Sequence, residues 1–311
     1  MAGIGVIVNP HARGNREHAQ RMKRFSDLVG TDGEVVATGD IAELEQALLR
    51  FHDCDIDILA VCGGDGSMYR TLTRALALWG EAEMPLLLPL RGGTINNLSR
   101  SIGARRRKAE SMLSHVVRDY RSGHTHEVVL RELLKVNEHD YGYLVGAGLV
   151  VNFLRQYYST KNPGPLSAFG LLARLFFSNL VGTSLITGVV ASFEADVECD
   201  GERVPLRSFN MLLASTISHV GLGIKPFYMS SRKRGHFHLL AGCCTAGAML
   251  GKLWRFFRGF PSGLEQMYDN MGARVVVRFA SPQAFTINGD ILDPVEELRL
   301  EGGPKLRFIS G

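Results

Sequence analysis

The sequence predicts an α/β domain with a parallel sheet, followed by a second domain that is mostly β. Up to about residue 103, short apolar runs alternate with amphipathic helical segments, which is the pattern of a parallel sheet covered by helices on both faces. After about residue 125, strand-like segments of period two dominate and few helices are expected. We therefore predict domains at 1–125 and 126–311.

Four apolar runs in the first domain, at 3–8, 35–37, 56–61 and 86–90, are expected strands. Helices are expected with Phe25 and Leu28 on one face, after Asp40, over 68–79, and from Asn96 onward. Asp40 is a good N-cap, because its carboxylate can accept a backbone N–H of the first turn. The loops that follow parallel strands meet at the carboxyl edge of the sheet, where open α/β folds bind ligands.

In the second domain, the expected strands are 194–199, 210–214, 236–240, 274–279 and 285–287. Asp200-Gly201 indicates a hairpin turn, and residues 247–260 are expected to form one helix. The apolar stretch 166–193 contains Arg174 and several glycines and polar residues, which favours a buried helix followed by a strand over a membrane span.

Two glycine-rich segments, 62–67 and 91–97, each follow an apolar strand. Glycines at such a place let backbone N–H groups approach a phosphate closely. Asp65 lies among these glycines, and a carboxylate beside a phosphate repels it unless the carboxylate holds a cation or takes a proton. The segments therefore predict phosphoryl transfer.

Charge and cysteine content exclude some classes of protein. A net charge of +4 is too diffuse to indicate nucleic-acid binding. The five cysteines form no CxxC pair, and we interpret them as reduced thiols of a cytoplasmic protein. The N-terminus lacks a basic region and is too short for a signal peptide, so we expect it to be a first buried strand.

Three motifs together resemble the diacylglycerol kinase catalytic-domain family, which includes bacterial lipid kinases and sphingosine kinases. They are Asn9-Pro10, Gly63-Gly64-Asp65-Gly66-Ser67, and the run from Gly93-Thr94-Ile95-Asn96-Asn97 to Gly103. The resemblance implies a nucleotide-binding α/β domain followed by a β-sandwich. It also implies that the last strand, about 297–311, returns to the first domain, and that the active site lies in the cleft between the domains.

The resemblance further implies ATP and Mg²⁺ as cofactors, with the γ-phosphoryl group passed to a lipid hydroxyl. Asp65 is the expected metal ligand and, with Asp290, the expected catalytic residue. The residues expected to bind the nucleotide are Asn9, Thr38, Gly63, Gly64, Gly66, Ser67, Thr94 and Asn96.

The late acidic motif of the family has two candidates. Asp200-Gly201-Glu202 matches its letters, but it lies within an alternating hairpin and is interpreted as a plain turn. Asn288-Gly289-Asp290 lies where the resemblance places the catalytic acid, and Asp290 is the expected general base. Arg70 stands where the family usually has Glu, and Asn97 stands where it usually has Asp. Arg234 replaces the acidic residue that can hold a structural magnesium in the family, so we expect no such site here.

The expected partners are a membrane lipid and an anionic membrane surface, with peripheral attachment and no nucleic acid; a homodimer is left open. Basic and aromatic residues interleave over 252–258, which suits such a surface, although the aromatics could equally be core. The alternatives are a kinase of a soluble acceptor, similar to NAD kinases, and a catalytically weak lipid-binding or regulatory relative.

Overall fold

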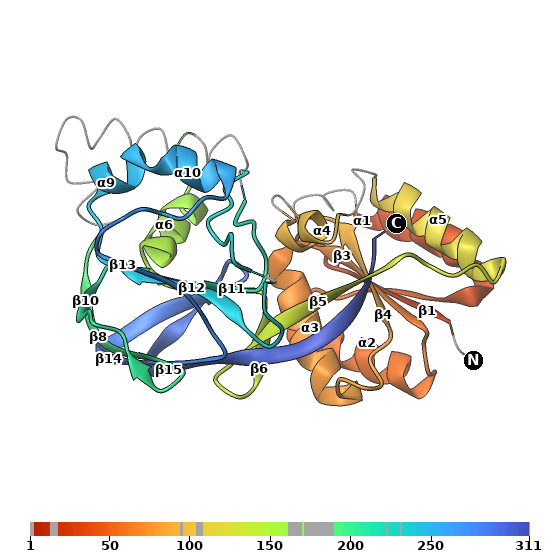
Figure 1. Ribbon diagram of the computed structural model, residues 1–311. Coiled ribbons are helices and arrows are strands. Elements are labelled where there is room, and N and C mark those ends of the chain that lie inside the picture. Colours follow the sequence, from red (N-terminus) through yellow and green to blue (C-terminus); the bar gives the residue numbers. More distant parts are fainter. Residues whose placement is uncertain are drawn as a thin grey trace. The chain divides into compact units, whose positions relative to one another are not determined.

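The computed structural model describes residues 3–12, 18–93, 96–103, 108–160, 170, 190–221, 223–230 and 232–310. The chain divides into two compact units, which are described separately (Figure 1). Unit 1 comprises Met1–Arg131 and Pro304–Gly311, and unit 2 comprises Glu132–Gly303. Strands β5 (Val128–Val136) and β15 (Asp290–Ile309) each contribute to both units. Nearly all of the helix and strand predicted over 166–193 lies outside the described residues.

Unit 1 contains a parallel sheet in the order β4-β3-β1-β2, and the end of β15 pairs with β4 at Phe308 and Leu87. The strands are β1 (Ile4–Val8), β2 (Gly33–Ala37), β3 (Ile58–Gly63) and β4 (Leu86–Arg91). Strands β1 and β3 are buried along their whole length, which explains their uninterrupted apolar sequences. The parallel α/β domain predicted from the sequence is confirmed.

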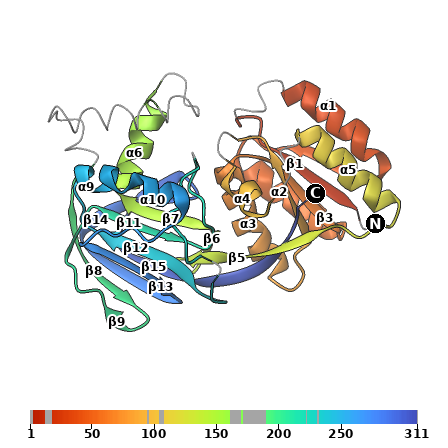
Figure 2. The ribbon, with the colours of Figure 1, turned by 45° about the horizontal axis from the view of Figure 1, so that its top comes forward.

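The helices of unit 1 cover both faces of this sheet. They are α1 (His18–Val29), α2 (Ile41–Asp53), α3 (Asp65–Trp79), α4 (Asn97–Ser101) and α5 (Ala109–Arg121), with a 3₁₀ turn, η2 (Gly30–Asp32). Helix α1 packs against α5 and α2 packs against α3 (Figure 2). Strand order reverses after β1, and right-handed crossovers then place α1 on one face and α2 and α3 on the other. The loops after β1 and β3 therefore diverge at a topological switch point.

Helix α2 begins where its sequence predicted. Asp40 has an extended backbone, and its Oδ1 accepts the N–H of Glu43 at 2.8 Å. Glu43 in turn accepts the N–H of Gly39 through Oε2 at 2.6 Å. These reciprocal contacts satisfy donors that the helix itself leaves open. The predicted N-cap is confirmed.

Helix α3 begins earlier than its apolar pattern suggested. The expected start was Met68, whereas the helix starts at Asp65 and has Gly64 as its N-cap. Glycine has a low helix propensity, so the sequence around Gly66 did not predict the first turn of the helix. The consequence is functional, because the backbone N–H groups of residues 65–67 belong to a helix N-terminus and not to a loop.

Unit 2 is rich in strands, as predicted, and its main sheet runs in the order β13-β12-β11-β7-β14-β15. The strands within unit 2 are β6 (Asp140–Gly142), β7 (Leu144–Gly148), β8 (Phe193–Cys199), β9 (Glu202–Arg203), β10 (Ser208–Phe209), β11 (Met211–Ser215), β12 (Phe237–Gly242), β13 (Met267–Gly272) and β14 (Arg274–Ile287). Helix α6 (Leu149–Tyr158) follows β7.

Strand β14 links two groups of strands in unit 2. Its first part, Val275–Phe279, pairs with β8, and its last part, Phe285–Ile287, pairs with β7. The sequence indicated two separate strands here, which was wrong. Register shifts between Arg278 and Phe285 interrupt the alternation around Pro282 without ending the strand.

The single helix predicted over 247–260 is also wrong. The chain forms two short helices, α9 (Ala246–Gly251) and α10 (Leu253–Arg258). Lys252, directly after Gly251, leaves helical geometry with φ −102° and ψ 1°, and Gly259 ends α10 with φ 69°. Among the described residues, no helix is long and apolar enough to cross a membrane.

Candidate active site

The glycine-rich segments after β3 and β4 are in backbone contact. Gly92 N donates to Gly63 O at 3.1 Å. A Cβ at Gly93 would lie 2.4 Å from Gly64 Cα, which is closer than real Cβ atoms approach. Glycine at position 93 is therefore required for the two segments to meet at the carboxyl edge of the sheet.

The N-terminus of α3 lies at this junction, and the helix itself provides no acceptors for its first backbone N–H groups. Its first described helical bond runs from Met68 N to Gly64 O at 3.1 Å, and Gly64 provides no side-chain cap. The preceding N–H groups have no acceptor within the helix. A helix of 15 residues also carries a partial positive charge at this end. The arrangement suits an anion such as a phosphate.

Gly64 keeps the approach to these donors open. Its φ of −90° is allowed for any residue. Among the described residues, a Cβ there would meet only Gly93 Cα, at 3.5 Å, which is ordinary contact. Neither backbone conformation nor packing against the described residues requires glycine at 64. A ligand that must come close to the backbone would require it, so the site fits the phosphates of a nucleotide.

Asn9 fastens the loop after β1 to the start of α3. Its Nδ2 donates to Ser67 Oγ at 2.7 Å, and its Oδ1 accepts the N–H of His11 at 2.8 Å. Its backbone N–H donates to Cys62 O at 3.1 Å. The residue thus holds the switch-point loops in position, in addition to any contact with a ligand.

Asp65 joins α3 to α4. Its Oδ2 accepts the N–H of Asn97 at 3.1 Å. Asn96, in the left-handed region with φ 52°, braces the preceding loop by donating from Nδ2 to Gly93 O at 2.7 Å and accepting Gly93 N at 3.2 Å. Sequence reasoning missed the contribution of Asn97, because a backbone N–H leaves no signal in residue type. Thr94 lies outside the described residues.

Thr38 lies at the same sheet edge, at the end of β2. It is buried, and its N–H donates to Val8 O at 3.0 Å. The contacts above connect Asn9, Gly63, Gly64, Asp65, Ser67 and Asn96 around the start of α3, with Gly66 in its first turn and Thr38 beside β1.

The donor set limits how a metal could bind. Among the described residues, no group of three or more His, Cys, Asp or Glu side chains is placed to hold a metal. Magnesium commonly uses one or two carboxylates, substrate phosphates and water. Asp65 therefore fits a magnesium ion that arrives with a nucleotide, and it does not fit a cage built from protein alone.

Two similar turns occur in unit 2, and they correspond to the two candidate acidic motifs. Asp200 and Gly201 have φ of 51° and 86° and connect β8 to β9. The Asp200 carboxylate accepts the N–H groups of Ala273 and Arg274 at 2.9 and 2.8 Å. The predicted hairpin is confirmed, and Asp200 has a structural role in it.

Asn288 and Gly289, with φ of 52° and 96°, form the turn between β14 and β15. Asn288 Oδ1 accepts Tyr143 N and Leu144 N at 2.9 and 3.0 Å. Tyr158 Oη donates to Gly289 O at 2.8 Å. Asp290 is half-buried and follows this anchored turn as the first residue of β15, so its backbone is firmly positioned.

Comparisons with known proteins place the sequence motifs in context. The sequence profile of the diacylglycerol kinase catalytic domain matches residues 3–129. No curated protein sequence matches the chain.

Among solved structures, a diacylglycerol kinase from Bacillus anthracis str. Sterne is similar over 99% of this chain and 96% of its own, with a TM-score of 0.64 and 13% identity. A candidate diacylglycerol kinase from the same strain gives a TM-score of 0.70 at 16% identity, with the same coverage of both chains. At these identities the likeness establishes the fold of the chain.

Proposed function

Since residues 3–129 match the sequence profile of the diacylglycerol kinase catalytic domain, we propose that the chain is an ATP-dependent lipid kinase. It transfers the γ-phosphoryl group to a hydroxyl of a membrane lipid of the diacylglycerol or sphingoid type. The observation that carries this proposal is the open approach to the start of α3, where Gly64 is required neither by its backbone nor by its neighbours.

Residues of unit 1 hold the nucleotide. The N–H groups at the start of α3 and the Ser67 hydroxyl bind its phosphates, and Asn9 orients Ser67 through the contact at 2.7 Å. ATP supplies the phosphoryl group, and a magnesium ion neutralises its charge. Phosphoryl transfer depends mainly on positioning and charge neutralisation, which is what a rigid, donor-rich helix start provides.

Two carboxylates complete the proposed machinery. Asp65 would hold a magnesium ion that arrives with the nucleotide, and its Oδ2 accepts the N–H of Asn97. Asp290 accepts the proton of the acceptor hydroxyl, and the fixed Asn288-Gly289 turn supports this role because a general base must reach hydrogen-bond distance.

The acceptor would be reached at the cytoplasmic surface of a membrane. Trp254, Phe257 and Phe260 are 53%, 43% and 43% exposed, whereas Phe256 is buried. Arg255 lies 5.5 Å from the centre of the Trp254 ring. Exposed aromatic side chains with interleaved cations are typical of surfaces that bind anionic membranes. This exposure favours membrane contact over the core interpretation for three of the four aromatics.

A catalytically weak, lipid-binding relative is the second candidate. The contact between Asp65 and the N–H of Asn97 favours it, because it gives the carboxylate a structural role. A phosphotransfer assay separates the two candidates. Labelled ATP and a total lipid extract yield a labelled lipid if the chain is a kinase, and the lipid product is then identified. A relative without activity yields no label above that of a heat-inactivated sample.

A further inference from the structure

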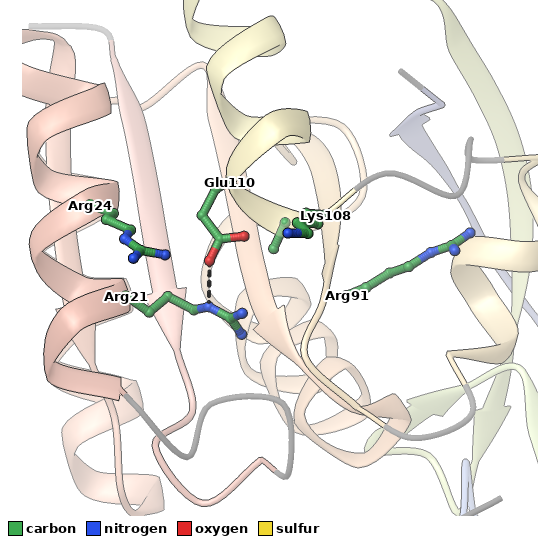
Figure 3. A pocket seen from close by; sticks show the side chains of 6 residues that line it. Arg21, Arg24, Arg91, Lys108 and Glu110 are labelled. Carbon is green, nitrogen blue, oxygen red and sulfur yellow. Dashed lines mark hydrogen bonds and ion pairs between the residues drawn. The ribbon is translucent and has the colours of Figure 1, made fainter.

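A cavity of about 330 Å³ lies in unit 1 between α1 and α5 (Figure 3). Arg21 and Arg24 reach it from α1, Arg91 from the end of β4, and Lys108, Ala109 and Glu110 from the start of α5. Sequence reasoning missed it because residues 21 and 110 are distant in the chain. The signal that was available is two arginines three apart, which share a helix face.

The lining of the cavity is strongly cationic. Among the described residues that line the cavity, four carry a positive charge and Glu110 is the one acid. Arg21 Nε donates to Glu110 Oε1 at 2.9 Å. Burial opposes ionisation of Glu110, but its own backbone N–H, Arg21 and Arg24 outweigh this and hold its pKa below the usual value. At neutral pH, the single charge of Glu110 therefore lies beside more than one cation, although the guanidinium of Arg91 extends away from it (Figure 3).

A role in holding α1 and α5 together explains only one of the cations around this cavity. The pair between Arg21 and Glu110 ties α1 to α5, and it requires one cation. Arg24 and Lys108 are exposed residues on the rim. Like charges held together repel each other and cost free energy unless an anion lies among them. Their convergence therefore points to a ligand of negative charge.

The backbone at the start of α5 also favours the binding of an anion. Helix α5 has 13 residues and begins after Lys108, which provides no side-chain cap. Its first described helical bond runs from Met112 N to Lys108 O at 3.0 Å, so the N–H groups before it have no acceptor within the helix. Backbone donors and cations thus meet at one end of the cavity, which is how proteins commonly bind phosphates.

Apart from Arg91, which begins the second glycine-rich segment, the described lining residues lie outside the glycine-rich site. Helices α1 and α5 pack together on the face of the sheet opposite to α3 (Figure 2). Arg91 lies directly before Gly92, and in Figure 3 its guanidinium extends away from Arg21 and Glu110. The two sites therefore occupy opposite faces of the same sheet edge.

We propose that this cavity binds a phosphate group, supplied either by a lipid headgroup or by a free phosphate. Guanidinium groups present paired N–H donors that match the oxygens of carboxylates and phosphates, which favours an oxyanion over a halide. Several cations around one site favour phosphate over a carboxylate, which carries a single charge. The volume is at the small end of ligand sites and suits a phosphate with its nearest substituents. This inference stands whether or not the chain transfers phosphoryl groups.

Calorimetry with inorganic phosphate at low salt tests the proposal on the full chain. The double variant Arg24→Gln/Lys108→Gln should lose at least about tenfold in affinity, since hydrogen bonds to charged groups contribute on this scale. Lys23→Gln, which removes an exposed cation from the same helix outside the cavity, should bind as the wild type does. Thermal unfolding checks that both variants are folded. No phosphate binding by the wild type, or equal affinity in all three proteins, overturns the proposal.

Two further titrations identify the source of the phosphate. Vesicles of phosphatidylcholine with and without phosphatidic acid are sedimented with wild type and double variant. Loss of binding only with phosphatidic acid indicates a headgroup. Equal vesicle binding together with weakened inorganic phosphate binding indicates a free phosphate. If the variant loses affinity for ATP alone, the cavity is an extension of the nucleotide site and a separate site is excluded.

Glu110→Gln gives a test of opposite sign. The substitution removes the negative charge of Glu110 from the lining, so phosphate should bind more tightly, by about threefold or more, as expected for one nearby unit charge removed. An exclusively structural role of the ion pair predicts no such gain. Weaker phosphate binding by a folded Glu110→Gln protein would contradict an electrostatic site.

Discussion

The carboxylate of Asp65 has one observed role, the hydrogen bond from Asn97 N–H, and one proposed role, the binding of magnesium. The two roles need different properties of the carboxylate. Accepting the N–H of Asn97 needs an oxygen, and an amide oxygen serves as well. Holding magnesium beside a phosphate needs a negative charge. A substitution that keeps the oxygen and removes the charge therefore separates structure from catalysis.

Asp65→Asn should lower turnover by about 100-fold or more, the range in which positioned charged groups act. The melting temperature should change little, because the amide can still accept from Asn97. Asp53→Asn, on the largely exposed end of α2, serves as the control. Steady-state kinetics and thermal unfolding are measured together. A large loss of stability in parallel with the loss of turnover would make Asp65 a structural residue.

Asp290 and Glu202 are distinguished by a pair of substitutions. Asp290→Asn should lower turnover by about 100-fold or more, as expected for removal of a general base. Glu202→Gln should have little effect, since Glu202 is exposed and opens β9 in a plain hairpin. The opposite ranking of the two variants in the same assay would show that the wrong acidic motif was chosen.

Asp269 makes unit 2 sensitive to acid. Burial opposes its ionisation, but hydrogen bonds from His238 at 2.8 Å, Ser262 N and Tyr228 hold its pKa below the usual 3.8. Because the pKa of Asp269 is lower in the folded state than in the unfolded state, its ionisation stabilises the fold at pH values above the unfolded-state pKa. This stabilisation is lost as the pH falls through the folded-state pKa. Asp269→Asn should therefore be less stable at neutral pH and lose less on acidification. Urea unfolding over a range of pH gives the free energy of unfolding of both proteins. If the wild type and Asp269→Asn show parallel pH profiles, Asp269 is not the source of the acid sensitivity.

Helix starts are the elements that organise unit 1. Helices α3 and α5 begin on opposite faces of the sheet, and each begins without a side-chain cap. Uncapped starts cost stability unless water or a ligand satisfies their donors. At α3 the neighbouring glycines keep the approach open, whereas at α5 cations line it.

Gly64→Val tests the start of α3. Its β carbon fits, at 3.5 Å from Gly93 Cα, but the two added methyl groups would obstruct the approach of the proposed phosphate to the backbone. ATP affinity should fall by at least about tenfold, the size of one lost charge-assisted hydrogen bond. Gly64→Ala should lose less, because it adds only the carbon that fits. Calorimetry that shows unchanged ATP affinity in a folded Gly64→Val protein would reject the phosphate site.

Substitutions in and beside α10 test whether this part of the chain contacts the membrane. Each cation near an anionic surface contributes about 1 kcal/mol, and salt screens this attraction. Lys252→Gln/Arg258→Gln should therefore weaken binding to anionic vesicles, most strongly at low salt, and leave ATP affinity unchanged. Arg255 is retained because its Nε donates to Pro261 O at 2.7 Å.

The control is Arg203→Gln/Arg207→Gln, which removes the same number of charges from the cluster around Asp196. Vesicle sedimentation compares the three proteins. Equal binding by the wild type and the Lys252/Arg258 variant would reject α9 and α10 as the docking surface.

At the scale of the whole molecule, the parts of the fold that could be predicted from the sequence are those whose strands are fully buried. Strands β1 and β3 are buried throughout, so their apolar runs predicted a parallel sheet and its ligand-binding edge. The break at Lys252 could not be predicted, because neighbouring residues continue the apolar pattern. The contact of Asp65 with Asn97 and the pairing of Arg21 with Glu110 depend on the folded chain bringing distant residues together, which local patterns do not record.

Phosphoryl transfer from ATP to a lipid is the activity that we propose for the whole chain. The most direct measurement supplies γ-labelled ATP, magnesium and mixed vesicles of diacylglycerol and a sphingoid base, and then separates lipids from water-soluble products. We predict that label enters the lipid fraction with wild type and falls by about 100-fold or more with Asp65→Asn. Label that enters only water-soluble acceptors such as NAD, or lipid labelling that is equal in both proteins, would contradict the claim.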